Sequence, residues 1–193
     1  MMSEKKENVI NGVIKKLKQG NADFVKNEKN EGDISQMIRT KTVAEGQKPY
    51  AVVITCSDSR VPPEHIFSAG IGELFVIRTA GNVIGDFELG SIEYAVGHLN
   101  TAVVLVMGHS HCGAVAAAIE GHGEGYINAI LEEIQPVIVG ETNVGKCENL
   151  NIENSIKRIL QSEMIKTMIG EGQVKVLGCK YDLGSGQVEF FEN

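Results

Sequence analysis

The fold of this chain is decided by one stretch of sequence, AVVITCSDSR at residues 51–60. Its first half is a continuous apolar run, rich in β-branched residues and too short for a helix, which is typical of a strand buried on both faces of a parallel sheet. Runs of similar character occur at residues 74–77, 102–107 and 174–178. The second half then places a polar loop that begins with a thiol directly after a buried strand.

Helical periodicity lies between these apolar runs, notably at residues 89–99 and 113–120. Strands that alternate with helices predict right-handed crossovers and an α/β fold with a mainly parallel central sheet flanked by helices. Ser185-Gly186 separates two short apolar segments and predicts a hairpin whose last strand is antiparallel at the edge of the sheet. Residues 121–147 are expected to be loops around one short helix at 127–134.

Residues 5–45 carry apolar side chains at helical spacing among lysines and glutamates, which predicts amphipathic helices. We expect Gly20 and residues 27–32 to break them. These helices could cover the chain's own core or form an arm that packs on a second subunit. The chain is interpreted as one domain, residues 1–193, with a helical arm at 1–45 and a zinc-binding α/β core at 46–193.

Composition excludes several classes of function. The chain has 193 residues, a formal net charge of -7 and a pI near 5.3, whereas nucleic-acid binding needs a basic face. No stretch approaches the roughly 20 apolar residues of a membrane span, and the lysine-rich start lacks the apolar centre of a signal peptide. The sequence therefore predicts a cytoplasmic protein with neither nucleic acid nor membrane as its partner.

Two of the four cysteines stand out by their spacing. In a reducing cytosol, thiols at metal-ligand spacing are better interpreted as ligands than as disulfide partners. Cys56 and Cys112 have such spacing, whereas Cys147 is expected to be a loop thiol and Cys179 a buried strand thiol.

A metal site is predicted from Cys56, His109 and Cys112. The first follows one buried strand and the second follows another, so both should emerge at the carboxyl edge of the sheet, where open α/β folds bind ligands. Cys112 lies three residues after His109 at a turn into a helix. Thiolate and imidazole suit zinc, and three protein ligands leave a fourth place for water, which is typical of a catalytic site. The alternative is a set of buried thiols with a histidine that satisfies local hydrogen bonds.

Asp58 and Arg60 lie close enough to Cys56 to act on that water. A carboxylate beside a metal-bound water can accept its proton in a hydrogen bond and orient the resulting hydroxide. Arg60 would keep Asp58 ionised through a paired hydrogen bond. An ordinary salt bridge within a loop is the alternative.

The motifs Cys-Ser-Asp-Ser-Arg at 56–60 and Gly-His-x-x-Cys-Gly at 108–113 resemble the β-class carbonic anhydrases. The similarity extends over residues 61–64, 72–82 and 90–96, and more weakly over 181–188. It implies reversible hydration of carbon dioxide to bicarbonate and a proton, by a zinc-bound hydroxide that the Asp58-Arg60 pair orients. It also implies one Zn²⁺ per subunit on Cys56, His109 and Cys112. The expected assembly is a homodimer or a dimer of dimers in which N-terminal helices embrace the neighbouring subunit.

Four further residues match the substrate pocket of the open, plant-like type of this family: Gln47, Phe75, Tyr94 and Gly113. In that type the glutamine binds substrate across a dimer interface. The bicarbonate-inhibited bacterial type instead uses a tryptophan in an effector pocket. This chain has no Trp, and Val53 stands at the matching position although Arg78 is retained. The resemblance therefore implies an active site without that bicarbonate switch.

Two other functions remain open at the level of sequence. A carbon disulfide-type hydrolase can use the same scaffold with an unaltered metal shell. A non-catalytic zinc-binding protein would have Asp58 locked onto the metal. His111 offers one more imidazole beside the ligands and is interpreted as a bystander.

Overall fold

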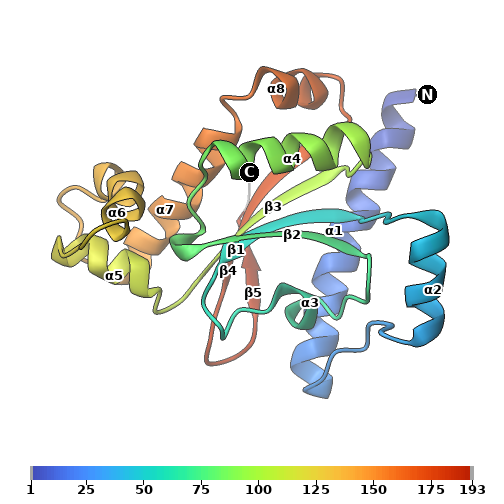
Figure 1. The fold of residues 1–193 in the computed structure, drawn as a ribbon, viewed down its shortest axis with the longest axis horizontal. Coiled ribbons are helices and arrows are strands. Elements are labelled where there is room, and N and C mark those ends of the chain that lie inside the picture. The colour runs from blue at the N-terminus through green and yellow to red at the C-terminus, as the bar shows by residue number, and fades with distance from the viewer. Residues whose placement is uncertain (1, 192–193) are drawn as a thin grey trace.

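The apolar runs form a five-stranded sheet in the computed structural model, which describes residues 2–191 (Figure 1). The strands are β1 (Ala51–Cys56), β2 (Leu74–Thr79), β3 (Val103–His109), β4 (Lys175–Tyr181) and β5 (Val188–Phe190). Their order across the sheet is β2-β1-β3-β4-β5. The first four are parallel and β5 runs antiparallel to β4 at the edge. This confirms the predicted α/β class and its antiparallel edge strand.

Helices flank the sheet on both faces (Figure 1). They are α1 (Met2–Asn27), α2 (Gln36–Glu45), α3 (Pro63–Ile66), α4 (Asp86–His98), α5 (Gly113–Glu120), α6 (Ile127–Ile134), α7 (Val144–Ile159) and α8 (Glu163–Gly170), with short 3₁₀ turns η1 (Ala80–Asn82) and η2 (Gln135–Val137). Ser35, Asn143 and Ser162 cap α2, α7 and α8 by accepting a backbone N–H with their side chains. None of the helices in residues 2–191 combines the length and the apolar character that crossing a membrane requires.

Both faces of β1 are buried, which explains its uninterrupted apolar sequence. Val53 faces a cluster that includes Leu17 of α1 and Ile66 of α3. Val52 and Ile54 face the opposite cluster, which contains buried side chains of α4, α7 and α8. Strand β1 is therefore packed between two apolar layers, and this packing fixes the position of its carboxyl end.

The first helix corrects one prediction. Helix α1 runs without interruption through Gly20, where the sequence predicted a break. A Cβ on Gly20 would lie 2.0 Å from the backbone oxygen of Phe67, at the end of α3. The glycine therefore lets two backbones approach closely instead of ending the helix. The break at residues 27–32 is confirmed, because α1 ends at Asn27.

The two N-terminal helices differ in how they pack. Leu17 of α1 is fully buried in the chain's own core. Helix α2 has no buried residue, and its Met37 and Val43 are 75% and 88% exposed. Figure 1 shows α2 on the opposite side of the molecule from α5 and α6. The N-terminal helices were expected either to cover the chain's own core or to pack on a second subunit. Helix α1 covers the core, and helix α2 does not.

Helix α7 was not predicted, and it corrects the placement of one cysteine. Cys147, expected in a loop, lies in the first turn of α7 and is fully buried. Asn143 starts the helix by capping the backbone N–H of Lys146, so the turn is ordered before Cys147 is reached. Cys179 lies in β4 and is buried, as predicted.

Candidate metal centre

The site lies where the order of the strands reverses. The chain passes from β1 to β2 on one side of β1 and then returns to place β3 on the other side. The connections after β1 and β3 therefore lead away from each other at the carboxyl ends of these two strands, the position at which open α/β folds bind ligands. Cys56 is the last residue of β1 and His109 is the last residue of β3. Strand order thus explains how residues so far apart in the chain become neighbours.

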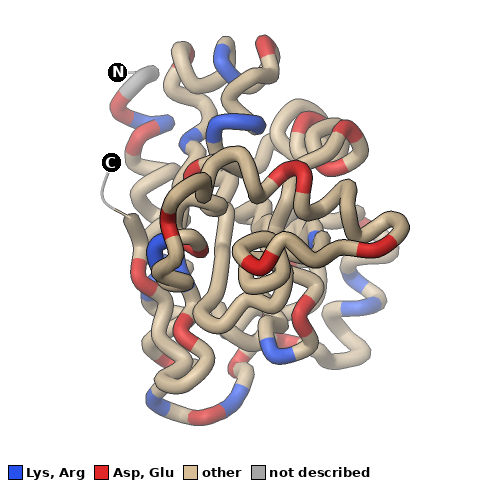
Figure 2. Tube along the Cα trace, turned by 90° about the vertical axis from the view of Figure 1, so that its left-hand side faces the viewer, with Lys and Arg blue, Asp and Glu red and all other residues tan. Residues whose placement is uncertain are grey.

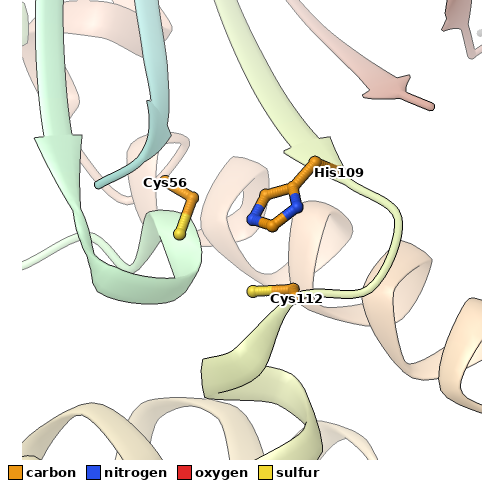
Figure 3. A group of neighbouring side chains, drawn as sticks. All are labelled: Cys56, His109 and Cys112. Carbon is orange, nitrogen blue, oxygen red and sulfur yellow. The ribbon is translucent and has the colours of Figure 1, made fainter. Parts of the chain in front are cut away.

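The three predicted ligands converge at the carboxyl ends of β1 and β3 (Figure 3). Their ligand atoms, two Sγ and one imidazole nitrogen, all lie within 4.8 Å of one another. Cys56, His109 and Cys112 are 5%, 1% and 2% exposed. Cys112 immediately precedes α5 and Figure 3 shows its sulfur turned toward the other two side chains. Tetrahedral zinc with Zn–S bonds of about 2.3 Å and Zn–N bonds of about 2.0 Å needs donor atoms at comparable separations.

The histidine presents the correct nitrogen for a metal. Nδ1 of His109 lies 2.9 Å from the backbone oxygen of Ser110. Because a carbonyl oxygen can only accept, Nδ1 carries the hydrogen and Nε2 of the neutral ring keeps its lone pair. Nε2 is buried and has no hydrogen-bond partner within residues 2–191. A buried acceptor without a partner is costly, and a coordinated cation would satisfy it.

The thiols of Cys56 and Cys112 lie close to each other. A hydrogen bond from Cys112 lowers the pKa of the Cys56 thiol, and the same bond raises the pKa of the Cys112 thiol. The Cys56 sulfur also accepts the backbone N–H of Gly81 at 3.3 Å. One thiolate is therefore stabilised in the absence of metal, and a divalent cation would replace the proton of the second. The donor set fits zinc.

Asp58 and Arg60 form a tightly bonded pair beside these ligands. Arg60 donates Nη2–H to Asp58 Oδ2 at 2.6 Å and Nε–H to Oδ1 at 2.9 Å. These hydrogen bonds hold the pKa of the Asp58 carboxyl well below its usual range. Oδ2 of Asp58 lies 4.0 Å from Nε2 of His109, so the carboxylate borders the cluster. Asp58 is turned toward Arg60 and is not one of the three clustered ligands.

Arg78 supports the same loop from the neighbouring strand. Its Nε–H donates to the backbone oxygen of Cys56 at 3.1 Å and its Nη2–H to that of Asp58 at 2.6 Å. The sequence associated Arg78 only with an effector pocket. The register of β1 and β2, which pairs Thr55 with Arg78, brings the side chain to this loop.

The predicted substrate residues separate into two places. Gly113 is the first residue of α5 and adjoins Cys112, with open space where a side chain would lie. Phe75 pairs with Val52, four positions before the β2 residue that pairs with Cys56, or about 13 Å along the strand. Its ring centroid lies 6.3 Å from that of Tyr94 on α4.

Gln47 also lies away from the metal ligands of its own chain. It is exposed in the segment between α2 and β1, at the amino end of the strand whose carboxyl end carries Cys56. Together with Phe75 and Tyr94 it therefore belongs to the far end of β1 and β2. Within one chain, only Gly113 of the four predicted substrate residues adjoins the cluster.

His111 contacts the site through its backbone carbonyl group. It is exposed, has a φ of +57°, and its carbonyl oxygen accepts a 3.4 Å hydrogen bond from Arg60. Its position between two ligands reflects the tight turn from β3 to α5.

The side of the molecule that carries α5 and α6 is mainly acidic. Residues 113–141 contain five glutamates and neither Lys nor Arg, and Figure 2 shows mostly acidic positions on this side, without a continuous basic stripe among the described residues. This distribution agrees with the net charge of -7 and with a small-molecule substrate.

This chain is similar in sequence and in fold to known carbonic anhydrases. The family model for carbonic anhydrase matches residues 51–188. Carbonic anhydrase 2 of Mycobacterium tuberculosis is 37% identical over 184 residues, covering 90% of this chain and 88% of that protein. A carbonic anhydrase of Mycolicibacterium smegmatis is 37% identical over 187 residues, covering 91% and 90%. Among solved structures, a tetrameric β-carbonic anhydrase of Sordaria macrospora superposes with a TM-score of 0.74 at 29% identity, covering 82% of this chain and 88% of that one.

Proposed function

This chain belongs to the β-carbonic anhydrase family, and from that premise we propose that it catalyses the zinc-dependent, reversible hydration of carbon dioxide to bicarbonate and a proton. The observation that carries the proposal is the buried convergence of Cys56, His109 and Cys112 beside an ionised Asp58-Arg60 pair. A site that only binds zinc for structural purposes would be closed by a fourth protein ligand.

Cys56, His109 and Cys112 would hold one Zn²⁺ per subunit. When bound, zinc lowers the pKa of a coordinated water toward neutrality and so supplies hydroxide as the nucleophile. The unpartnered Nε2 of His109 and the two neighbouring sulfur atoms are the features of this chain that accommodate the ion.

Asp58 would act by orienting the nucleophile. Because Arg60 keeps it ionised, its carboxylate can accept hydrogen bonds but cannot donate one. It therefore selects the orientation in which the hydrogen of a hydroxide points to Asp58 and a lone pair points to carbon dioxide. Arg60 fixes the carboxylate through two hydrogen bonds, and Arg78 fixes the backbone on which the carboxylate stands.

The substrate pocket would be completed by a second subunit. Gln47, Phe75 and Tyr94 lie at the far end of β1 and β2 from their own chain's metal ligands, so they can serve a metal centre only in another copy. The exposed apolar residues Met37 and Val43 of α2 support a contact between copies next to Gln47. The tetrameric state of the Sordaria macrospora relative is consistent with a dimer or a dimer of dimers.

Bicarbonate is proposed to be a substrate and not an effector. Val53, which occupies the position of the effector-pocket tryptophan, is fully buried in the core. Arg78 has its guanidinium committed to the backbone of Cys56 and Asp58. Initial rates measured against bicarbonate should therefore follow a simple saturation curve.

The cytoplasm is the proposed location. All four cysteines are free and buried, which suits a reducing compartment. Separation of the soluble cell contents from membranes and from secreted material, followed by detection of the protein in each fraction, would test this.

Stopped-flow measurement of carbon dioxide hydration tests the proposed function. Zinc-loaded protein should accelerate hydration at mildly alkaline pH, and removal of zinc by a chelator should abolish the acceleration until zinc is restored. Protein with stoichiometric zinc and no hydration activity at that pH would exclude the proposal and leave a zinc-binding role. Turnover of carbon disulfide in the same preparation would instead favour the hydrolase.

A further inference from the structure

Helix α7 has a buried polar face that the mechanism above does not use. Glu148, Asn151 and Ser155 are only 4%, 1% and 2% exposed. Their spacing of three and four residues places them on one side of the helix. Buried polar groups are costly unless they are hydrogen-bonded, so the partners of these side chains indicate what the face does.

Glu148 is bonded to the turn that carries one of the metal ligands. The backbone N–H of Cys112 donates to Glu148 Oε1 at 3.2 Å. Oε2 of Glu148 lies 2.6 Å from Nζ of Lys180, and the side chain of Lys180 is itself mostly buried. Lys180 pairs in the sheet with Gly108, the residue before His109. The Glu148–Lys180 ion pair therefore connects the backbone of Cys112 to β4, the strand that lies beside the end of β3 that carries His109.

Asn151 is connected to the third ligand, Cys56, through one intervening residue, Gly81. Its Nδ2–H donates to the backbone oxygen of Gly81 at 2.7 Å, and the backbone N–H of Gly81 donates to Cys56 Sγ at 3.3 Å. Ser155 donates to the backbone oxygen of the next residue, Asn82, at 2.8 Å. Gly81 and Asn82 both have left-handed backbone conformations, with φ of +67° and +48°. The helix thus secures a locally unfavourable turn that bonds the Cys56 sulfur.

Two other polar contacts of α7 lead elsewhere. Asn154 donates to the backbone oxygen of Glu133 in α6, and Arg158 pairs with Asp86 of α4 at 2.7 Å. Neither contact touches a ligand-bearing segment. Helix α7 therefore carries side-chain contacts that lead to the metal ligands and comparable contacts that do not, and the second set can serve as controls.

We propose that Glu148 and Asn151 are positioning residues for the metal centre: they hold the Cys112 amide and the Gly81 peptide, and through them the two sulfur ligands, in a metal-ready arrangement. The proposal rests on the metal site of the proposed function. Two thiols and an imidazole already lie within 4.8 Å of one another, and the contacts of α7 account for the backbone order this requires. Partners of this kind typically change metal affinity about 10–100-fold.

Two variants separate positioning by Glu148 from a purely structural role. E148Q keeps an acceptor oxygen for the Cys112 N–H but leaves the Lys180 charge without its partner, so it should lose stability and keep much of the zinc affinity. E148L/K180M replaces both charges by apolar side chains of similar volume, which is often neutral for stability, but it removes the acceptor. We expect the double variant to be the more stable to heat without zinc and the weaker in binding zinc.

N151A tests the second contact, with N154A as its matched control on the same helix. Each removes one side-chain hydrogen bond to a backbone carbonyl. Only N151A should weaken zinc binding, by roughly 10-fold or more. D86N, which breaks the Arg158 pair, is the corresponding control for Glu148.

The readouts are zinc affinity by competition with a chromophoric chelator, the absorption spectrum of Co²⁺-substituted protein, and Tm without metal. The inference is supported if E148L/K180M and N151A alter the sulfur-to-cobalt absorption and zinc affinity while N154A and D86N do not. It is overturned if zinc affinity follows Tm across all variants, or if the cobalt spectra are identical. Wild-type protein that binds no zinc would defeat the proposed function itself, whereas normal zinc binding in every variant would defeat only this inference.

Discussion

The two ends of the parallel sheet differ in how complete they are within one chain. At the carboxyl end, the three predicted ligands are at most 5% exposed, and hydrogen bonds from β2 and α7 hold their loops. At the amino end, Val43 is 88% exposed and Tyr94 is 48% exposed. The carboxyl end thus gathers its three predicted ligands within one chain, whereas apolar side chains at the amino end stay exposed. The proposed function accordingly assembles the metal centre within a subunit and the substrate pocket between subunits.

The largest effect is expected from removing a ligand at the carboxyl end. C112S should lose zinc and reduce hydration to the uncatalysed rate, because a serine hydroxyl is a much poorer zinc ligand than a thiolate. The loss of zinc affinity should exceed the roughly 10–100-fold typical of outer partners. C147S is the control, since Cys147 is equally buried and lies outside the cluster. Metal analysis after gel filtration measures both, and equal loss of zinc from C147S would refute the ligand assignment.

The next largest effect should come from D58N, which keeps the size of the side chain and removes its charge. Arg60 would lose its ionic partner, and the amide could donate a hydrogen bond where only an acceptor orients the nucleophile. We expect the hydration kcat to fall roughly 100-fold or more with zinc content unchanged. D23N, at a partly exposed position of α1 outside the metal cluster, should leave kcat unaltered. Loss of zinc from D58N would show that Asp58 acts as a ligand.

A smaller effect is expected at the amino end from Q47A, which should lower kcat/KM roughly 10-fold by removing one substrate hydrogen bond. The comparison of the two ends also predicts complementation. Mixing unfolded Q47A and D58N chains and refolding them should form hybrid dimers in which one site has both an intact Asp58 and an intact Gln47.

Hydration by this mixture should exceed the mean of the two separate variants, and stopped-flow rates at equal zinc content measure it. Refolded wild type is the control for recovery. If the mixture shows only that mean although hybrid dimers are present, Gln47 serves its own chain and the proposed division between the ends is wrong.

The smallest effect on the metal centre is expected from M37K/V43K on α2. Because neither residue is buried within the chain, the fold should persist while the interface between copies is weakened by two desolvated charges. Sedimentation should show smaller species that still bind zinc, with activity reduced as for Q47A. K41A, on the same helix, should leave the assembly intact. Loss of zinc along with the larger assembly would mean that the carboxyl end is not complete within a chain.

Elements with simple apolar patterns were predicted well. Helices at residues 113–120 and 127–134 have the bounds that their periodicity predicts, and the buried run at 51–55 is most of β1. Helix α7 was missed because Glu148, Asn151 and Ser155 interrupt its apolar pattern on the buried side. Glu148 bonds the Cys112 amide, and Asn151 and Ser155 bond the turn whose Gly81 N–H donates to the Cys56 sulfur. The interruption of the apolar pattern of α7 therefore marks a buried polar face whose side chains are hydrogen-bonded.

Gly20 shows a second limit of local reasoning. A glycine within a helical pattern indicates a break when only neighbours in sequence are considered. Here the close approach of the Phe67 backbone, 47 positions later in the chain, requires the absence of a side chain. Contacts at such separation leave no periodic signal.

By itself, the sequence determined the chemistry of the centre and the class of the fold, because donor atoms and strand character are properties of residue type. It predicted Cys56, His109 and Cys112 as zinc ligands, and Asp58 with Arg60 as the pair that orients the hydroxide. Only the tertiary structure decided that β3 lies beside β1, that Glu148 of α7 bonds the Cys112 amide, and that Gln47 belongs to the far end of the sheet. Those features depend on strand order and on packing between distant segments, which no local pattern of residues encodes.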